Sequence, residues 1–355
     1  MAATTGTAAP GDVVAGPGGR TRRSRRDAVR FAGLLAAVTL LVLVLLASIA
    51  LGSRSIPLPT TWRLLWDADG SSESVIIHDL RIPRTLLGLG VGMALGLSGA
   101  LMQALTLNPL AEPGLLGVNL GASTGVVVAI AYFGIASLTG YIWFAFAGAA
   151  ATSAAVFVLG GTGRQPTPER QVLAGIAITA VLGAFVWGVL VTERHAFDRY
   201  RHWDVGSIAE RETGTPAEVA PFLVIGILLA LALGRPLNAM ALGDEAAAAV
   251  GAHPGRTKAL GFVAVTLLCG AATAAAGPIW FLGLAVPHAA RMITGPDQRW
   301  VLAYSLALAP AILLAADIIG RLVVTPSELQ VGIVTAFLGA PVFLALCRRR
   351  RIAQL

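Results

Sequence analysis

The feature that most constrains this chain is a series of apolar segments, each close to 20 residues long and nearly free of charge. The first, residues 31–51, has no charged side chain. A helix of that length rises about 1.5 Å per residue and crosses a hydrocarbon core roughly 30 Å thick. The chain is therefore predicted to be an all-α polytopic membrane protein with about ten transmembrane helices in a single transmembrane domain, residues 31–351. The nine further apolar segments are 83–104, 115–135, 141–160, 172–192, 217–237, 257–277, 279–294, 300–320 and 329–347.

Composition agrees with a membrane protein. Hydrophobic residues make up 56% of the chain and charged residues 13%, whereas an average soluble domain has about 25% charged residues. A water-soluble enzyme is therefore not expected. A cleaved signal peptide is the alternative interpretation of the first segment, but this segment is longer than the usual apolar region of about 7 to 15 residues. The eighth segment, 279–294, is the weakest, since Pro287, His288 and Arg291 interrupt it, and we expect it to be tilted, broken or re-entrant.

A net charge of +7 could indicate a nucleic-acid partner, so the positions of the basic residues along the chain have to be considered first. Residues 1–30 are rich in Gly, Ala, Thr and Arg and are predicted to form a disordered, basic cytoplasmic tail. With both termini inside, 17 of the 26 basic residues fall on the cytoplasmic side, as the positive-inside rule requires. The charge is thus explained by topology in the lipid bilayer, and no nucleic-acid partner is needed.

Two stripes of small residues repeat every fourth position and so lie on one face of their helices. Such stripes are typical of close helix packing in membranes, and a direct contact with substrate is the alternative. The glycines of the two stripes are Gly88, Gly92, Gly96, Gly117, Gly121 and Gly125.

Two polar connections are candidates for function. Asn108 to Gly114 contains two prolines and Glu112, and it is either a simple cap with Glu112 solvated or a segment that lines a water-filled path. Residues 238–256 read NAMALGDEAAAAVGAHPGR, which predicts a short helix that begins at Asp244 and ends before Gly251. An exposed helix made largely of alanine resembles a knob for the groove of a partner protein.

Several chemistries have no support in the sequence. Lys258 is the only lysine and is followed by Ala259, so the chain has no G-x-x-x-x-G-K-[ST] phosphate-binding loop. The five histidines lack the spacing of a metal site, and we expect neither a metal, a cofactor nor a catalytic residue in this chain. Asp317 and Arg321, four residues apart, are predicted to pair with each other. Ionisable groups within the segments are too few to favour an ion-coupled carrier.

Four stretches together resemble the FecCD-type permeases of binding-protein-dependent ABC importers, the class of the ferric siderophore and vitamin B12 permeases. The clearest runs from Arg81 to Ser123, RIPRTLLGLGVGMALGLSGALMQALTLNPLAEPGLLGVNLGAS, and the others are 203–209, 274–300 and 316–350. The resemblance covers about residues 35 to 350. It implies a vitamin B12 permease-like fold in the bacterial cytoplasmic membrane, as a multi-pass protein.

The resemblance also implies partners and a cargo. A second permease subunit, identical or related, would complete the path. Two cytoplasmic ATPase subunits would bind ATP and Mg²⁺, and an extracytoplasmic substrate-binding protein would deliver the substrate. Ferric siderophore is the expected cargo because it is the commonest in the family, and cobalamin or haem are the alternatives. Outside this class, the alternatives are an ion-coupled secondary transporter and a membrane scaffold.

Finally, the resemblance assigns roles to residues. Two arginines among them also have a simpler interpretation: Arg81 could extend to the lipid headgroups, and Arg321 could be fully occupied by its pairing with Asp317. The implied contact surface for the ATPases consists of coupling helices in 238–256, centred on Leu242, Gly243, Asp244, Glu245 and Gly251. The implied cytoplasmic gate consists of Asn108, Leu110, Thr167 and Arg170, and the implied docking residues for the binding protein are Arg81, Arg84 and Arg321.

Overall fold

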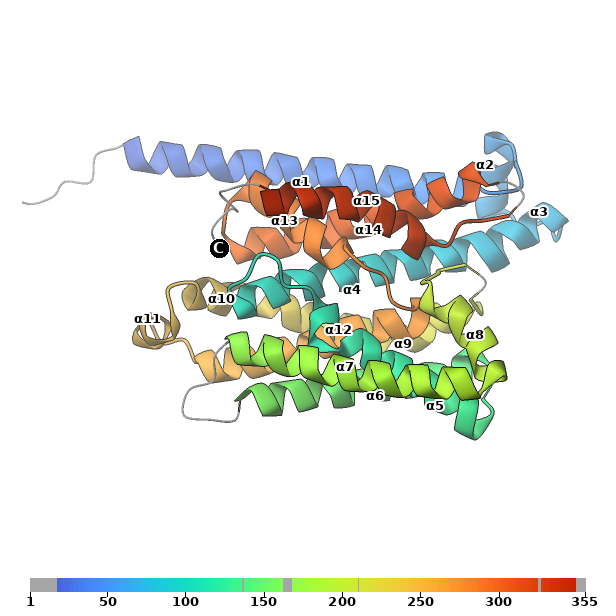
Figure 1. Cartoon of the computed structure of the whole chain (residues 1–355). Coiled ribbons are helices and arrows are strands. Elements are labelled where there is room, and N and C mark those ends of the chain that lie inside the picture. Colours follow the sequence, from blue (N-terminus) through green and yellow to red (C-terminus); the bar gives the residue numbers. More distant parts are fainter. Residues whose placement is uncertain (1–17, 136, 162–167, 210, 325–326, 349–355) are drawn as a thin grey trace, which may run out of the picture.

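The structure, a computed structural model, describes residues 18–135, 137–161, 168–209, 211–324 and 327–348 (Figure 1). These residues form helices and no β-strand, so the predicted all-α class is confirmed. Each predicted apolar segment corresponds to one helix. These helices are α1 (Gly18–Ala50), α4 (Ile82–Thr106), α5 (Val118–Phe133), α6 (Leu138–Gly161), α7 (Pro168–Thr192), α9 (Thr215–Ala232), α12 (Pro254–Ala276), α13 (Leu282–Thr294), α14 (Gln298–Val323) and α15 (Val331–Arg348).

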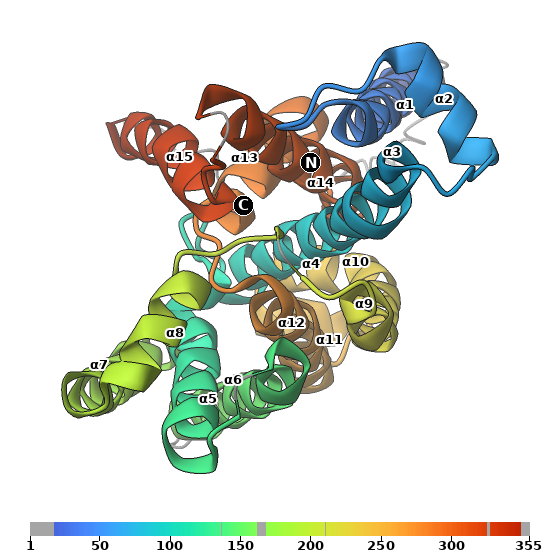
Figure 2. The ribbon, with the colours of Figure 1, turned by 90° about the vertical axis from the view of Figure 1, so that its right-hand side faces the viewer.

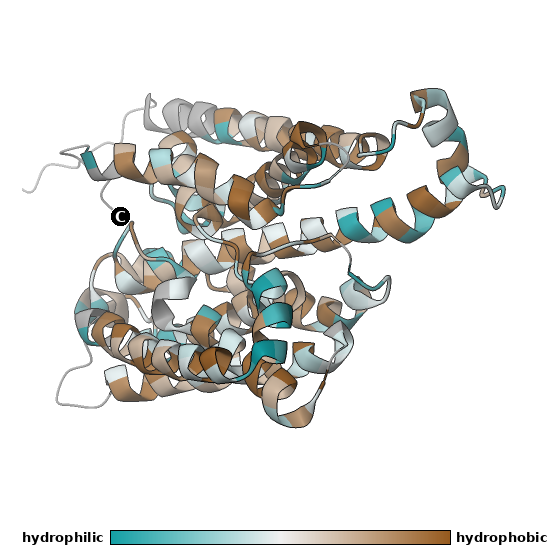
Figure 3. Cartoon of the chain, turned by 45° about the vertical axis from the view of Figure 1, so that its right-hand side comes forward, coloured by the Kyte–Doolittle hydropathy of each residue, from teal (hydrophilic) through white to brown (hydrophobic). Residues whose placement is uncertain are grey.

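Shorter helices lie at the two ends of the bundle (Figure 1). One end carries α10 (Gly234–Met240) and α11 (Asp244–Ala249), and we refer to it as the cytoplasmic end, following the distribution of basic residues. The opposite, outer end carries α2 (Leu58–Trp66), α3 (Ser72–Val75) and α8 (Arg194–Asp204). A π-helical turn, η1 (Ile76–Arg81), joins α3 to α4, and a 3₁₀ turn, η2 (Pro113–Leu116), precedes α5. Hydrophobic residues dominate the long helices, while α8 is markedly hydrophilic (Figure 3).

Among the described residues, seven helical stretches are long and apolar enough to cross a membrane by length and composition. The segments around α5, α13 and α15 fall short of that test, and α13 is the shortest with 13 residues. At about 1.5 Å per residue, α13 spans about 20 Å, well below the roughly 30 Å of the hydrocarbon core. The weak eighth segment is thus a half-length helix that starts inside the bundle.

The N-terminal prediction needs correction. Helix α1 begins at Gly18, so residues 18–30, predicted to be disordered, are helical; the first 17 residues lie outside the described range. Contacts with the start of α14 and the end of α13 hold this end of α1. Tyr304 Oη donates to the carbonyl of Arg30 at 2.7 Å, and Arg30 Nη2 donates to the carbonyl of Thr294 at 2.6 Å. The local composition carries no sign of these long-range bonds.

Helix α4 is the centre of the bundle and packs against α14, α12, α13 and α9 (Figure 2). Its predicted glycine stripe faces α14: a Cβ on Gly88 would lie 2.6 Å from Leu314 Cδ2, and one on Gly92 would overlap the backbone of Pro310. The stripe of α5 faces α6 in the same way, with Gly121 against Gly148 and Gly125 against Phe144. The small residues therefore set the spacing of the central helices, since any side chain there would force the helices apart.

A second close contact brings α4 to the half-length helix α13. A Cβ on Gly99 would overlap the backbone of Gly283, and a Cβ on Gly283 would lie 3.4 Å from Pro113 Cδ. The segment after α4 therefore turns back into the bundle, where Ala111, Pro113 and Gly114 are buried. Two incomplete crossings, α13 and the turn before α5, meet on one face of α4.

The packing predicts opposite effects for two Gly→Ala changes. Gly92→Ala places a methyl group on Pro310 and should lower stability by about 1–3 kcal/mol, as overpacking does. Gly188→Ala, on α7, meets no atom within 4 Å and should be neutral or stabilise by up to about 1 kcal/mol through helix propensity. Thermal unfolding of the two variants in the same detergent measures this contrast. Equal midpoints would contradict the close α4–α14 contact.

Candidate functional site

The cytoplasmic end presents an exposed surface on and beside α11, which we call the coupling surface (residues 241–251). The predicted short helix is confirmed: Asp244 and Glu245 form its first turn, and Gly243 and Gly251 flank it with φ of 94° and 84°. These positive φ values favour glycine, because a Cβ would be strained there. Leu242, beside this helix, is 68% exposed.

Polar contacts fix this surface to the long helices behind it. Lys258 Nζ, at the start of α12, lies 2.6 Å from Asp244 Oδ2. Asn238 Nδ2, in α10, donates to Asp297 Oδ1 at 2.7 Å, and the N–H of Gln298 donates to Asn238 Oδ1 at the same distance. A displacement of α11 would therefore pull on the first turn of α12, and a displacement of α10 would pull on the first turn of α14.

Asp297 is the N-cap of α14, and its charge is well stabilised. Hydrogen bonds from Arg299, followed in importance by the bond from Asn238, lower the pKa of Asp297 from about 3.8 to about 2. The carboxylate thus stays ionised at any physiological pH. It serves as a permanent acceptor between α10 and α14.

Two of the four predicted gate residues, Asn108 and Leu110, lie in the connection after α4, residues 107–112, which we call the gate loop. Leu107 ends α4 with φ of 49°, and Asn108 Oδ1 accepts the N–H of Leu110 at 2.9 Å to close a tight turn. Asn108 is exposed and Leu110 is half-buried. Of the other two predicted gate residues, Arg170 is exposed in the first turn of α7, and Thr167 lies outside the described residues. The gate role of all four stays a prediction.

Glu112, at the end of the gate loop, is not simply solvated, so that interpretation is wrong. Its Oε1 accepts the N–H of Phe281 at 2.7 Å, across 169 residues of sequence. Phe281 is the N-cap of α13 and has φ of 69°, an uncommon conformation for a bulky residue. The Phe281 side chain in turn lies against Gly339 and Phe343 of α15. The Glu112 carboxylate therefore connects the gate loop to the start of α13, and the Phe281 side chain extends this contact to α15.

Two buried polar pairs near this junction, Asn119 with Thr273 and Gln103 with Arg291, were not predicted from the sequence. Asn119 Oδ1, in α5, accepts a hydrogen bond from Thr273 Oγ1 of α12 at 3.2 Å. Gln103 of α4 accepts from Arg291 of α13, and its Nε2 donates to the carbonyl of Leu284 at 3.3 Å. An arginine in the last turn of an apolar helix was the one available signal, since intramembrane charges often mark function.

At the outer end, two of the three predicted docking arginines, Arg84 and Arg321, form one network with two carboxylates, and Arg81 binds backbone carbonyls beside them. Asp317 pairs with Arg321, as predicted, and also with Arg84, whose Nη2 lies 2.7 Å from Asp317 Oδ1. Arg84 Nη1 contacts Glu328 Oε2 at 2.6 Å. Arg81 Nη1 donates to the carbonyl of Ala50 at 2.7 Å. The network thus ties the ends of α1, α4 and α14 together and satisfies carbonyls left free at the end of α1.

Burial in this network limits which of the predicted docking arginines a partner protein could reach. Arg81 and Arg321 are only 5% and 2% exposed, so Arg81 does not extend to the lipid headgroups, and Arg321 is occupied by Asp317. Arg84, by contrast, lines a cavity of about 220 Å³ that opens beside Arg211, Glu212 and Glu328. Docking through any of the three stays a prediction, and Arg84 has the best access to a partner.

Comparison with known proteins decides the family. Residues 40–349 match the FecCD transport family. The chain belongs to this family. It is 44% identical over 324 residues to the ferric enterobactin permease FepD of Escherichia coli, covering 91% of this chain and 96% of FepD. It is also 36% identical to a probable siderophore permease, YfiZ of Bacillus subtilis, covering 89% and 95% of the two chains.

A solved structure agrees with the fold. A metal-chelate type ABC transporter in an inward-facing conformation superposes with a TM-score of 0.78 and 25% identity, over 89% of this chain and 98% of the other. This FecCD chain is therefore an ABC importer permease, a multi-pass protein of the bacterial cytoplasmic membrane and not an enzyme by itself.

The Glu112–Phe281 bond predicts a graded mutational series. Glu112→Ala leaves the N–H of Phe281 without its acceptor and should lower stability by about 1–3 kcal/mol. Glu112→Gln keeps an acceptor oxygen at the same reach and should recover most of this loss. Thermal unfolding in detergent measures the series, with Glu245→Ala as the exposed control. Equal losses in the Ala and Gln variants would contradict the assigned bond.

Asp297 predicts a pH effect with a defined sign. Because its pKa is lower in the folded state, its stabilisation is fully present above about pH 4 and is lost as the pH falls through about 2. The difference in unfolding midpoint between the wild type and Asp297→Asn should be constant from pH 5 to 8 and narrow between pH 4 and 2. A difference that stays constant down to pH 2 would show that the charge of Asp297 does not contribute.

Proposed function

We propose that this permease forms the transmembrane path of an importer for ferric siderophores, energised by separate ATPase subunits. The observation that carries the proposal is the 44% identity with a ferric enterobactin permease over nearly the full length of both chains. The likeness to a probable siderophore permease and to a metal-chelate type transporter supports the same cargo class.

In this proposal the coupling surface meets two cytoplasmic ATPases, which bind the ATP and Mg²⁺ that this chain does not bind. The exposed Leu242 and the adjacent Asp244 and Glu245 give the surface an apolar point beside two carboxylates. Movement of α11 would reach α14 through the adjoining α10, whose Asn238 makes a short, charge-assisted bond to Asp297. ATP binding in the partners would thereby tilt the central helices as rigid bodies.

The gate loop would respond to this tilt. Since Glu112 joins the loop to Phe281, a shift of α13 against α4 would move the turn at Asn108 and Leu110 with it. The path itself would be completed by a second permease subunit, either another copy of this chain or a related one. At the outer end, a substrate-binding protein would dock beside the Arg84 cavity and deliver the siderophore.

Haem and cobalamin are the alternative cargoes. A hemin permease of Yersinia pestis is 37% identical to this chain, and a cobalamin permease of Halobacterium salinarum is 32% identical. Uptake into proteoliposomes that contain the permease, its ATPase and its binding protein tests the choice. Accumulation of ⁵⁵Fe presented as ferric siderophore, with no uptake of haem or cobalamin, is the expected result. Uptake of haem or cobalamin in preference would contradict the proposed cargo.

The coupling surface predicts a selective loss of ATPase association. Leu242→Glu should reduce co-purification of the ATPase at least tenfold without changing the unfolding midpoint, because the side chain is 68% exposed. Leu58→Glu is the matched control, since Leu58 is 66% exposed at the outer end of the bundle. Equal ATPase recovery with both variants would exclude Leu242 from the interface.

A further inference from the structure

The short helix α2, at the outer end of the bundle, carries large apolar side chains that the described part of the chain leaves uncovered. Leu58, Trp62 and Trp66 are 66%, 59% and 78% exposed. Because they recur every fourth residue, they form one stripe along the helix. Tryptophan is common at the level of lipid headgroups, where its ring meets both hydrocarbon and water. The stripe therefore has the composition of a membrane contact.

The opposite face of α2 is held at the height where α1 leaves the membrane. Leu64 of α2 is buried with Ile77 in a small apolar core. Ile49, in the last turn of α1, and Ile82, in the first turn of α4, pack against the same core. The charge-free part of α1 has the length of the hydrocarbon core, so its last turn marks the outer boundary of the hydrocarbon. Helix α2 is thus fixed at this boundary.

Helix α2 also has the orientation of a helix that lies in the membrane interface. It runs across the end of α1 at the edge of the bundle, whereas the spanning helices run roughly side by side (Figures 1 and 2). Arg63, next to the stripe, pairs with Asp69 at 3.4 Å, and both side chains are exposed. An apolar face beside a charged one is the pattern of a helix in the interface plane.

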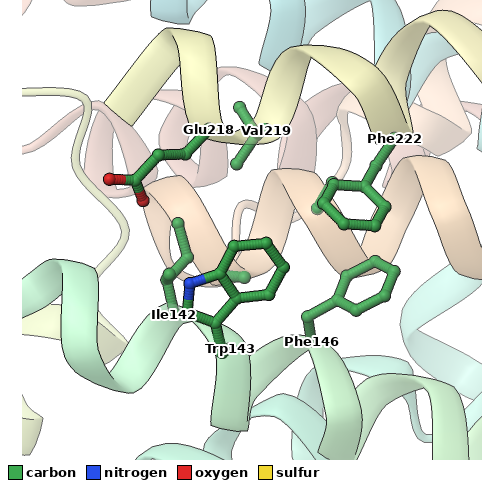
Figure 4. A pocket seen from close by; sticks show the side chains of 8 residues that line it. Ile142, Trp143, Phe146, Glu218, Val219 and Phe222 are labelled. Atoms are coloured by element: carbon green, nitrogen blue, oxygen red, sulfur yellow. The ribbon is translucent and has the colours of Figure 1, made fainter. Parts of the chain in front are cut away.

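The surroundings of the stripe indicate what covers it. The exposed apolar surface of α1, which faces lipid in a spanning helix, extends to Leu51, shortly before α2. Among the described aromatic side chains, Trp62 packs only against Trp66, with ring centroids 6.0 Å apart. Trp143, at the same end of the bundle, instead packs against Phe222 in a small pocket between α6 and α9 (Figure 4). Lipid that continues from the surface of α1 is the partner that fits the stripe.

We propose that α2 inserts Leu58, Trp62 and Trp66 into the outer leaflet and thereby anchors the outer end of α4 to the lipid surface. The connection to α4 runs through His78, in the π-helical turn η1 that leads into this helix. Its Nε2 donates to the carbonyl of Leu64 at 2.8 Å. The lipid contact is independent of the cargo and of the partner proteins.

Fluorescence quenching of the full chain in lipid nanodiscs tests this contact. The emission of Trp62 and Trp66 is the difference between the wild type and the double variant Trp62→Leu/Trp66→Leu. Phosphatidylcholine brominated in the upper part of its acyl chains should quench about half of this emission or more, since an interfacial helix buries its apolar face about 5–10 Å into the headgroup and acyl boundary. Lipid brominated near the chain ends should quench it less, and aqueous iodide should quench only a small part.

The control is Trp203→Phe, which removes an indole that is 1% exposed. The emission lost in this variant should resist both brominated lipid and iodide. The double variant changes only exposed side chains and should keep the unfolding midpoint of the wild type in detergent.

Two outcomes would overturn the proposal. Quenching of the Trp62 and Trp66 emission by iodide in preference to brominated lipid would place the stripe in water, where a partner protein could reach it. Resistance of this emission to both quenchers would show that protein, such as a second copy of the chain, covers the stripe.

Discussion

Hydrocarbon offers no hydrogen bonds to an exposed backbone, and two segments of this permease break the backbone pattern of a complete transmembrane helix. Helix α13 is too short to cross, and the chain before α5 turns through the gate loop and η2 instead of continuing as a helix. Both segments are tolerated because they meet each other and α4 inside the protein. Gly99 and Gly283 allow this approach, since a Cβ on Gly99 would overlap the backbone of Gly283, and one on Gly283 would lie only 3.1 Å from the carbonyl oxygen of Leu95.

Polar side chains then complete the bonds that the broken helices leave open. Glu112 accepts the N–H at the start of α13, and Gln103 donates to carbonyls of the same helix. At the outer end, Arg81 and Arg321 serve the carbonyls at the end of α1, while Asp317 balances two arginines. These bonds hold the ends of α1, α4, α13 and α14 together.

Much of this architecture could be predicted from the sequence, because it depends on local patterns. The apolar segments, the weak eighth crossing, the short helix at Asp244 and the Asp317–Arg321 pair all follow from spacing within a few residues. The bonds that join distant segments could not be predicted in this way. Arg84 meets Asp317 across 233 residues, and nothing in the local sequence of Glu112 points to Phe281. The helix over residues 18–30 was missed for the same reason, as its contacts come from α13 and α14.

The central claim is that this chain provides the path and the partners provide the energy. Transport by proteoliposomes that hold the permease with its ATPase and binding protein tests it most directly, with ATP and ion gradients varied separately. The account predicts ⁵⁵Fe-siderophore uptake with ATP and Mg²⁺ on the ATPase side, unaffected when protonophores and Na⁺ ionophores collapse the gradients. Uptake driven by a proton or sodium gradient in vesicles that contain this chain alone would contradict it.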